Sequence, residues 1–235
     1  MTIKYKNLGL IDYKEAWDLQ EKLFNQTFDA KLSGKLDEIE NRLFFLQHPH
    51  VYTLGKSGDK SHLLLNEDLL RSKGADFYHI NRGGDITYHG PGQIVGYPIF
   101  DLDGLGLSIR NYIYNLEEVI IKVLQTYGVE ASRSEGETGV WLEIGNKARA
   151  RKIAAIGVKI SKMVSMHGFA FNINTNLEYF SHIVPCGIAD KGVTTLQKEL
   201  GREISLEEVE KHLLNQFEEV FKVEIKTWGP TWLTN

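Results

Sequence analysis

Short runs rich in β-branched and aromatic residues follow one another along the chain, and several are joined by connections too short to hold a helix. Seven strands are predicted, over residues 43–46, 51–54, 86–88, 95–100, 140–142, 153–160 and 166–173. Parallel neighbours need a crossover of about a dozen residues or more, so strands with short connections pair antiparallel. The pattern predicts an α/β (α+β) fold of mixed, largely antiparallel β-sheets flanked by helices.

Three amphipathic helices are predicted to cover these sheets. Asp12 and Ser205 each stand three residues before a glutamate, which is the capping-box pattern of a helix start. Apolar residues then recur every three or four positions, and the same spacing holds over 109–127, where Gly128 supplies a stop. Each helix has one apolar face, so we expect all three to pack on a sheet.

The chain has 235 residues, 42% of them hydrophobic, and no linker rich in Gly, Ser or Pro divides it. We therefore expect a single domain over residues 1–235, with a core that needs no disulfide or structural metal. One cysteine excludes intramolecular disulfides and cysteine-rich zinc sites. The first twenty residues lack the continuous apolar stretch of a signal peptide, and no apolar run approaches the length of a membrane span, so a cytoplasmic protein that does not enter a membrane is expected.

Charge is nearly balanced over the whole chain but not along it. The net charge of −4 comes from 27 basic and 31 acidic residues, and no nucleic-acid partner is expected from it. Residues 145–177 nevertheless carry six basic side chains and no acidic one. This segment is either a solvated strand or loop face, or a surface for an acidic partner, and charge alone leaves both interpretations open.

The single cysteine lies in the sequence IVPCGI at 183–188. Pro185 fixes the backbone before Cys186 and Gly187 removes side-chain bulk after it, which favours a sulfur at an exposed turn over a small buried apolar residue. A nucleophilic thiolate needs a base or a cation nearby. The candidates are His89, His167, His182 and Lys152. Lys152 opens the apolar run KIAAIGV, and a snorkelling strand-end lysine is the alternative interpretation.

A second unusual segment is RGGDITYHGPGQ at 82–93, where four glycines and one proline are interleaved with polar side chains. A plain hairpin needs one or two glycines, whereas this density lets the backbone approach a ligand closely. The segment has neither the spacing of a phosphate-binding loop nor that of a dinucleotide fingerprint. It predicts a ligand-lining loop.

Small residues also interrupt two predicted strands. They are Ala155, Ile156 and Gly157 in one strand, and Gly168, Phe169 and Ala170 in the other. Such triplets either leave a slot for a slim apolar chain or let strands pack tightly on helices. The pair His48 and His50 lacks a third ligand at a suitable spacing, so no metal site is predicted.

Four motifs in order, RGGDITYHGPGQ (82–93), KIAAIGVKIS (152–161), MHGFAFNINT (166–175) and IVPCGI (183–188), closely resemble those of the lipoyl(octanoyl) transferases. The resemblance implies the fold shared by biotin and lipoate protein ligases. It implies an enzyme that moves octanoyl from octanoyl-acyl carrier protein to a lysine of lipoyl domains, in the E2 subunits of 2-oxoacid dehydrogenases and in the glycine cleavage H protein. No cofactor is expected. The protein is expected to be a monomer.

The resemblance also assigns roles to residues. It implies that Cys186 is the nucleophile, which carries the acyl group as a thioester, and that Lys152 activates it. The implied substrate-binding residues are Arg82, Gly83, Gly84, Asp85, Ile86, Thr87, Tyr88, His89, Ala155, Ile156, Gly157, Gly168, Phe169 and Ala170. The chain departs from the family pattern at His50, Lys159 and Thr195, which bear on loop shape and partner docking.

Three other functions stay open. An ATP-dependent lipoate or biotin-type protein ligase on the same fold would activate a free acid as an adenylate and would not need a cysteine. A related transferase passes octanoyl between two lipoyl-accepting proteins. A non-catalytic acyl-binding or partner-binding module would not need the residues of an active site.

Overall fold

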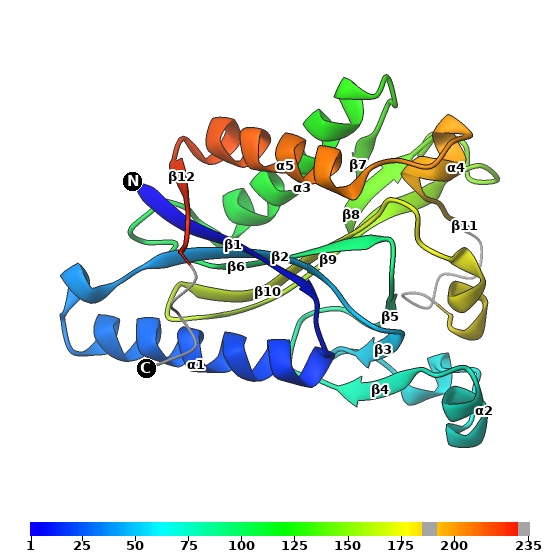
Figure 1. Ribbon diagram of the computed structural model, residues 1–235, viewed down its shortest axis with the longest axis horizontal. Helices are drawn as coiled ribbons and strands as arrows, with labels where there is room; N and C mark the ends of the chain where they lie inside the picture. Colours follow the sequence, from blue (N-terminus) through cyan, green and yellow to red (C-terminus); the bar gives the residue numbers. More distant parts are fainter. Residues whose placement is uncertain (185–191, 230–235) are drawn as a thin grey trace.

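The computed structural model describes residues 1–184 and 192–229. A large sheet crosses the molecule, with α1 on one face and α3 and α5 on the other (Figure 1). A small sheet lies beside the N-terminal end of α1 (Figure 1). The strands are β1 (Thr2–Leu10), β2 (Asn41–Gln47), β3 (Val51–Leu54), β4 (Asp76–His79), β5 (Ile86–His89), β6 (Gln93–Ile99), β7 (Ser132–Ser134), β8 (Glu137–Leu142), β9 (Arg151–Ser161), β10 (Val164–Asn172), β11 (Gly192–Val193) and β12 (Glu224–Thr227). The α-helices are α1 (Tyr13–Leu32), α2 (Glu67–Ser72), α3 (Ile109–Thr126), α4 (Leu196–Leu200) and α5 (Leu206–Phe221), and the short 3₁₀ helices are η1 (Leu36–Glu38), η2 (Lys60–His62) and η3 (Leu177–His182).

The large sheet is mixed, as the sequence predicts. Its strand order is β12-β1-β2-β6-β10-β9-β8-β7, and β11 pairs with β9 off this path. From β2 to β7 every pair along this order is antiparallel, whereas β1 is parallel to both β12 and β2. The small sheet has the order β4-β3-β5 and combines one parallel with one antiparallel pair.

The prediction of seven strands was too low. All seven are present, and the described residues add β1, β4, β7, β11 and β12. β7 and β11 are too short to show a period of two, and three of the four residues of β12 are exposed. These three strands therefore have no apolar pattern that the sequence could reveal. The helix starts are confirmed: the Asp12 side chain accepts hydrogen bonds from two backbone N–H groups, and Ser205 accepts one from Glu208.

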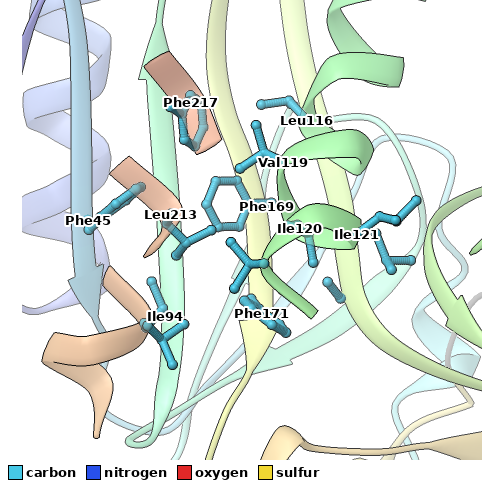
Figure 2. Close-up of a cluster of buried hydrophobic side chains, with 14 of the residues drawn as sticks. Phe45, Ile94, Leu116, Val119, Ile120, Ile121, Phe169, Phe171, Leu213 and Phe217 are labelled. Carbon is cyan, nitrogen blue, oxygen red and sulfur yellow. The ribbon is translucent and has the colours of Figure 1, made fainter. Parts of the chain in front are cut away.

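The main core lies between the large sheet and the helix pair α3 and α5. Figure 2 shows that aromatic side chains from the sheet meet aliphatic and aromatic ones from the two helices. The labelled side chains are Phe45, Ile94, Phe169 and Phe171 from strands, Leu116, Val119, Ile120 and Ile121 from α3, and Leu213 and Phe217 from α5. Among residues 1–184 and 192–229, no helix combines the length and apolar character needed to cross a membrane.

Candidate active site

A cavity of about 800 Å³, here called the central cavity, is lined by strands of the large sheet, by β5, and by the loop before β5. Lys152 and all but one of the described substrate-binding residues predicted from the sequence lie on its wall. Tyr88 is the exception: its ring packs with Tyr52 and Tyr179 in the core of the small sheet, and its hydroxyl donates a 2.7 Å hydrogen bond to His50. Cys186 lies outside the described residues.

Two of the cavity glycines are in close backbone contact. A Cβ atom at Gly157 would lie 3.0 Å from the carbonyl oxygen of Gly83, and one at Gly168 would lie 2.1 Å from that of Gly96. These glycines therefore let strand and loop backbones approach one another. Apolar side chains provide much of the remaining wall, among them Val95, Ile156, Val158 and Phe169.

Arg82 joins the small sheet to the large one. Its buried guanidinium donates hydrogen bonds to the carbonyl oxygen (2.8 Å) and hydroxyl (3.0 Å) of Thr53 and to the carbonyl oxygen of Gly83 (2.9 Å). Cβ atoms at Gly55 and Gly157 would lie 2.9 and 3.3 Å from its Nη1 atom. Glycine at both positions makes room for this buried cation.

Three buried histidines lie behind and along the cavity wall. His48 donates from Nδ1 to the carbonyl oxygen of Ile11 and accepts at Nε2 from the Tyr97 hydroxyl, at 2.9 and 2.8 Å. His89 donates from Nδ1 to the Gln93 side chain at 2.8 Å. His167 has a positive φ of 58° inside a strand, and its buried Nε2 has no hydrogen-bond partner among the described residues.

Burial decides the charge of these histidines. It lowers the pKa of His89 and of His167 to about 3 each, with a smaller contribution from the nearby positive charge of Arg82. It also lowers the pKa of His48 to about 4. All three are neutral at pH 7 and are weak bases there, because an effective general base has a pKa near the working pH. Of the predicted bases, His89 and His167 line the cavity but are poorly suited to activate a thiol, and His182 is not on its wall.

Lys152 reaches the cavity from the start of β9. Its Nζ atom lies 4.5 Å from the centre of the Trp141 ring and donates a hydrogen bond to the carbonyl oxygen of Thr138 at 3.3 Å. The two strands that flank β9 here are β8, where Trp141 is the register partner of Lys152, and β11, where Val193 is. The lysine that the sequence singles out is therefore held at the cavity by ordered neighbours.

An imidazole–carboxylate pair also lines the cavity. His62, at the end of η2, donates from Nδ1 to the carboxylate of Asp85, and its carbonyl oxygen accepts a 2.8 Å hydrogen bond from the N–H of Val184. Asp85 was predicted to bind substrate, and in the structure one of its carboxylate oxygens contacts this histidine. His62 was not predicted, because a histidine in a polar loop carries no local pattern.

The chain is similar to known proteins over most of its length. The lipoyl protein ligase A/B catalytic domain family matches residues 12–218. An octanoyltransferase of Christiangramia forsetii is 54% identical over 229 residues, which are 95% of this chain and 97% of that protein. The chain belongs to the octanoyltransferases of this family. It is an acyltransferase of the lipoyl(octanoyl) transferase class, as the four sequence motifs indicated.

Solved structures place the octanoyltransferase in the predicted fold. A bipartite lipoate protein ligase of Thermoplasma acidophilum superposes with a TM-score of 0.71 at 16% identity, covering 99% of this chain and 88% of that one. Biotin protein ligase of Aquifex aeolicus superposes with a TM-score of 0.54 at 14% identity, covering 93% and 70%. The prediction of a fold shared with biotin and lipoate protein ligases is confirmed.

The basic segment of this octanoyltransferase is not one continuous charged face. Arg151 forms ion pairs with Glu143 and Glu199, and Arg149 forms one with Glu143 at 3.1 Å. Lys159 lies over the ring of Phe24 on α1, 4.8 Å from its centre. The basic residues that are neighbours in the sequence therefore have different surroundings in the structure: some are neutralised by glutamates, and one lies over an aromatic ring.

Proposed function

We propose that this octanoyltransferase takes its acyl group from octanoyl-acyl carrier protein and passes it to a lysine of lipoyl domains, through a thioester on Cys186. Lipoyl domains of E2 subunits and the glycine cleavage H protein are the proposed acceptors. The observation that carries the proposal is the position of Lys152 on the wall of the central cavity, where the histidines His89 and His167 are neutral and poor bases. A lysine of this kind can supply either the base or the cation that a thiolate requires.

The first half-reaction exchanges one thioester for another. The Cys186 thiolate attacks the acyl carbon, the bond from that carbon to the carrier's sulfur breaks, and Lys152 supplies the proton that the departing thiol takes up. In the second half-reaction the acceptor lysine, as a free amine, attacks the new thioester. An amide forms, the bond to the Cys186 sulfur breaks, and the amine proton passes to Lys152. Conversion of a thioester into the more stable amide makes the reaction favourable without ATP.

The apolar wall of the central cavity supports a hydrocarbon substrate. Ile156, Val158 and Phe169 line it together with Val95 and Ala170, and each methylene removed from water by such a surface contributes about 0.8 kcal/mol. An eight-carbon chain is therefore bound mainly by burial, while the polar residues of the 82–89 segment orient its reacting end.

The test is intact-mass spectrometry after incubation with octanoyl-carrier protein in the absence of ATP. The wild-type protein is expected to gain one octanoyl group that hydroxylamine removes and that passes to an added lipoyl domain. Cys186→Ser is expected to gain no thioester, and Lys152→Ala to gain it at least about tenfold more slowly. If Cys186→Ser transfers octanoyl at the wild-type rate, the covalent mechanism is wrong. If the acceptor is modified only when octanoate and ATP are supplied, the protein acts as a ligase.

A further inference from the structure

The side chain of Lys152 lies against the backbone of β8 at Gly139. A Cβ atom at Gly139 would lie 3.3 Å from Cε and 3.4 Å from Cδ of Lys152, and 2.7 Å from the carbonyl oxygen of Ala154. Gly139 also has a φ of 129°, which favours glycine. The stem of the lysine therefore runs against the β8 backbone, and its ammonium emerges over the Trp141 ring.

The Trp141 ring is fixed from several sides. Only 2% of the residue is exposed, and its Nε1–H donates to the carbonyl oxygen of Glu137 at 3.2 Å. The adjoining backbone is tied to α3, because the N–H of Gly139 donates to the buried carboxylate of Glu117 at 3.0 Å. That carboxylate in turn forms a 3.1 Å ion pair with Arg133. The indole face under Lys152 is thus held by β8 and by a helix of the main core.

An indole face attracts a cation more strongly than the face of any other aromatic side chain. The Thr138 carbonyl oxygen, 3.3 Å from Nζ, adds a second favourable contact for positive charge. We infer that Trp141 is a positioning residue, which holds the Lys152 ammonium at the cavity so that the ammonium stabilises a thiolate. The inference rests on the proposed function, and it assigns Lys152 the role of a fixed cation in the resting enzyme.

Thiolate reactivity tests the inference apart from acyl transfer. Because the chain has one cysteine, the rate of alkylation by iodoacetamide, followed by intact mass, reports on Cys186 alone. Trp141→Leu is expected to slow both alkylation and octanoyl-enzyme formation by about three- to thirtyfold, the range of a cation–π contact. Trp141→Phe keeps an aromatic face and is expected to stay within about threefold of wild type. Trp228→Leu is the matched control, since the Trp228 ring lies over Arg42, 5.3 Å from its guanidinium carbon.

A double-mutant cycle separates positioning from a general loss of packing. If Trp141 acts through Lys152, adding Trp141→Leu to Lys152→Ala causes no further loss of either rate. Equal losses in the two backgrounds would mean that Trp141 is merely structural and would overturn the inference. Wild-type alkylation in Trp141→Leu, with slow alkylation in Lys152→Ala, would overturn the inference and leave the proposed function standing. Wild-type alkylation in Lys152→Ala would overturn the inference that Lys152 acts as a fixed cation, and the mass-spectrometric test above would then decide the proposed function separately.

Discussion

Several glycines of the central cavity are in close contact with neighbouring backbone. Gly168 is the clearest case, because a Cβ atom there would lie 2.1 Å from the Gly96 carbonyl oxygen and 2.6 Å from Cδ of Pro98. Backbone cannot move aside as a flexible side chain can, so an added methyl group forces β10 and β6 apart. The sequence left open either a slot for an apolar chain or tight packing of strands on helices. The backbone that Gly168 contacts belongs to the neighbouring strand β6, and Gly168 also lines the central cavity.

We predict that Gly168→Ala lowers the free energy of unfolding by about 1–3 kcal/mol, the usual cost of overpacking. Gly145→Ala is the matched control, because a Cβ atom at Gly145 would meet nothing within 4 Å. It is expected to change stability by no more than about 0.5 kcal/mol. Urea unfolding at constant pH measures both, and equal midpoints for the two variants would contradict the prediction.

The residues of the site differ in how much their sequence context reveals. The spacing of glycines and polar residues was enough to place Arg82 and His89 on a ligand-lining loop, and both line the cavity. Trp141 and His62 were missed, because a single aromatic in a strand or a single histidine in a loop fits many structures. Their importance comes from contacts with Lys152 and Asp85, which are distant in sequence.

At the scale of elements, buried strands and long helices could be predicted from the sequence more readily than the strands at the edges of the sheet. The strands β2, β6 and β10 lie in the middle of the sheet and read as nearly continuous apolar runs, so their existence could be predicted. In contrast, β12 takes its place from parallel pairing with β1 at the opposite end of the chain. No local pattern records such a pairing, so β12 was not among the seven predicted strands.

β9 also separates the two ends of the basic segment. Lys147 precedes the strand, on the side of Lys152, and Lys162 follows it. Ten residue steps from Arg151 to Ser161 span about 33 Å in a strand. Charges this far apart are separated by several Debye lengths at physiological salt, so each end of β9 acts separately on the charges of an approaching partner.

We predict that charge reversal at the two ends has different effects. An acidic carrier protein that docks at the Lys152 end of β9 is attracted by Lys147, so Lys147→Glu is expected to raise the KM for the carrier protein and to weaken the dependence of this KM on salt. Lys162 is also exposed, and Lys162→Glu is expected to change neither the KM for the carrier protein nor its dependence on salt. Initial rates at low and high salt with octanoyl-carrier protein measure this. If Lys147→Glu and Lys162→Glu change the KM and its salt dependence equally, the carrier protein does not dock preferentially at the Lys147 end of β9, and the prediction is wrong.

At the scale of the whole molecule, the three neutral histidines link the site to global stability. His48 lies where the segment after β2 meets α1 and β6, since its partners are the carbonyl of Ile11 and the hydroxyl of Tyr97. His89 lies in the small sheet and His167 in the large one. All three occupy the region where the two sheets and α1 meet, so protonation of any of them places a buried charge at that junction.

The sign of the pH dependence follows from these pKa values. In the unfolded chain a histidine has a pKa of about 6.5, whereas the folded values are about 4, 3 and 3 for His48, His89 and His167. Between these limits the unfolded chain binds more protons than the folded one. The contribution to stability is therefore complete above about pH 6.5 and is lost as the pH falls toward 4 and then 3.

We predict that well below pH 6.5 each buried histidine lowers the free energy of unfolding by about 1.4 kcal/mol per pH unit. The contributions of three such residues add, so the folded state weakens steeply between about pH 6.5 and 5, before most carboxylates take up protons. Urea unfolding at several pH values gives the slope directly. His48→Gln is expected to lower the free energy of unfolding at neutral pH, because the two hydrogen bonds of His48 change. It is also expected to make the dependence of that free energy on pH less steep, by the contribution of one histidine, about 1.4 kcal/mol per pH unit. A wild-type stability that stays constant from pH 7.5 to 5 would contradict the prediction, and would mean that these histidines gain their protons without unfolding the junction between the two sheets.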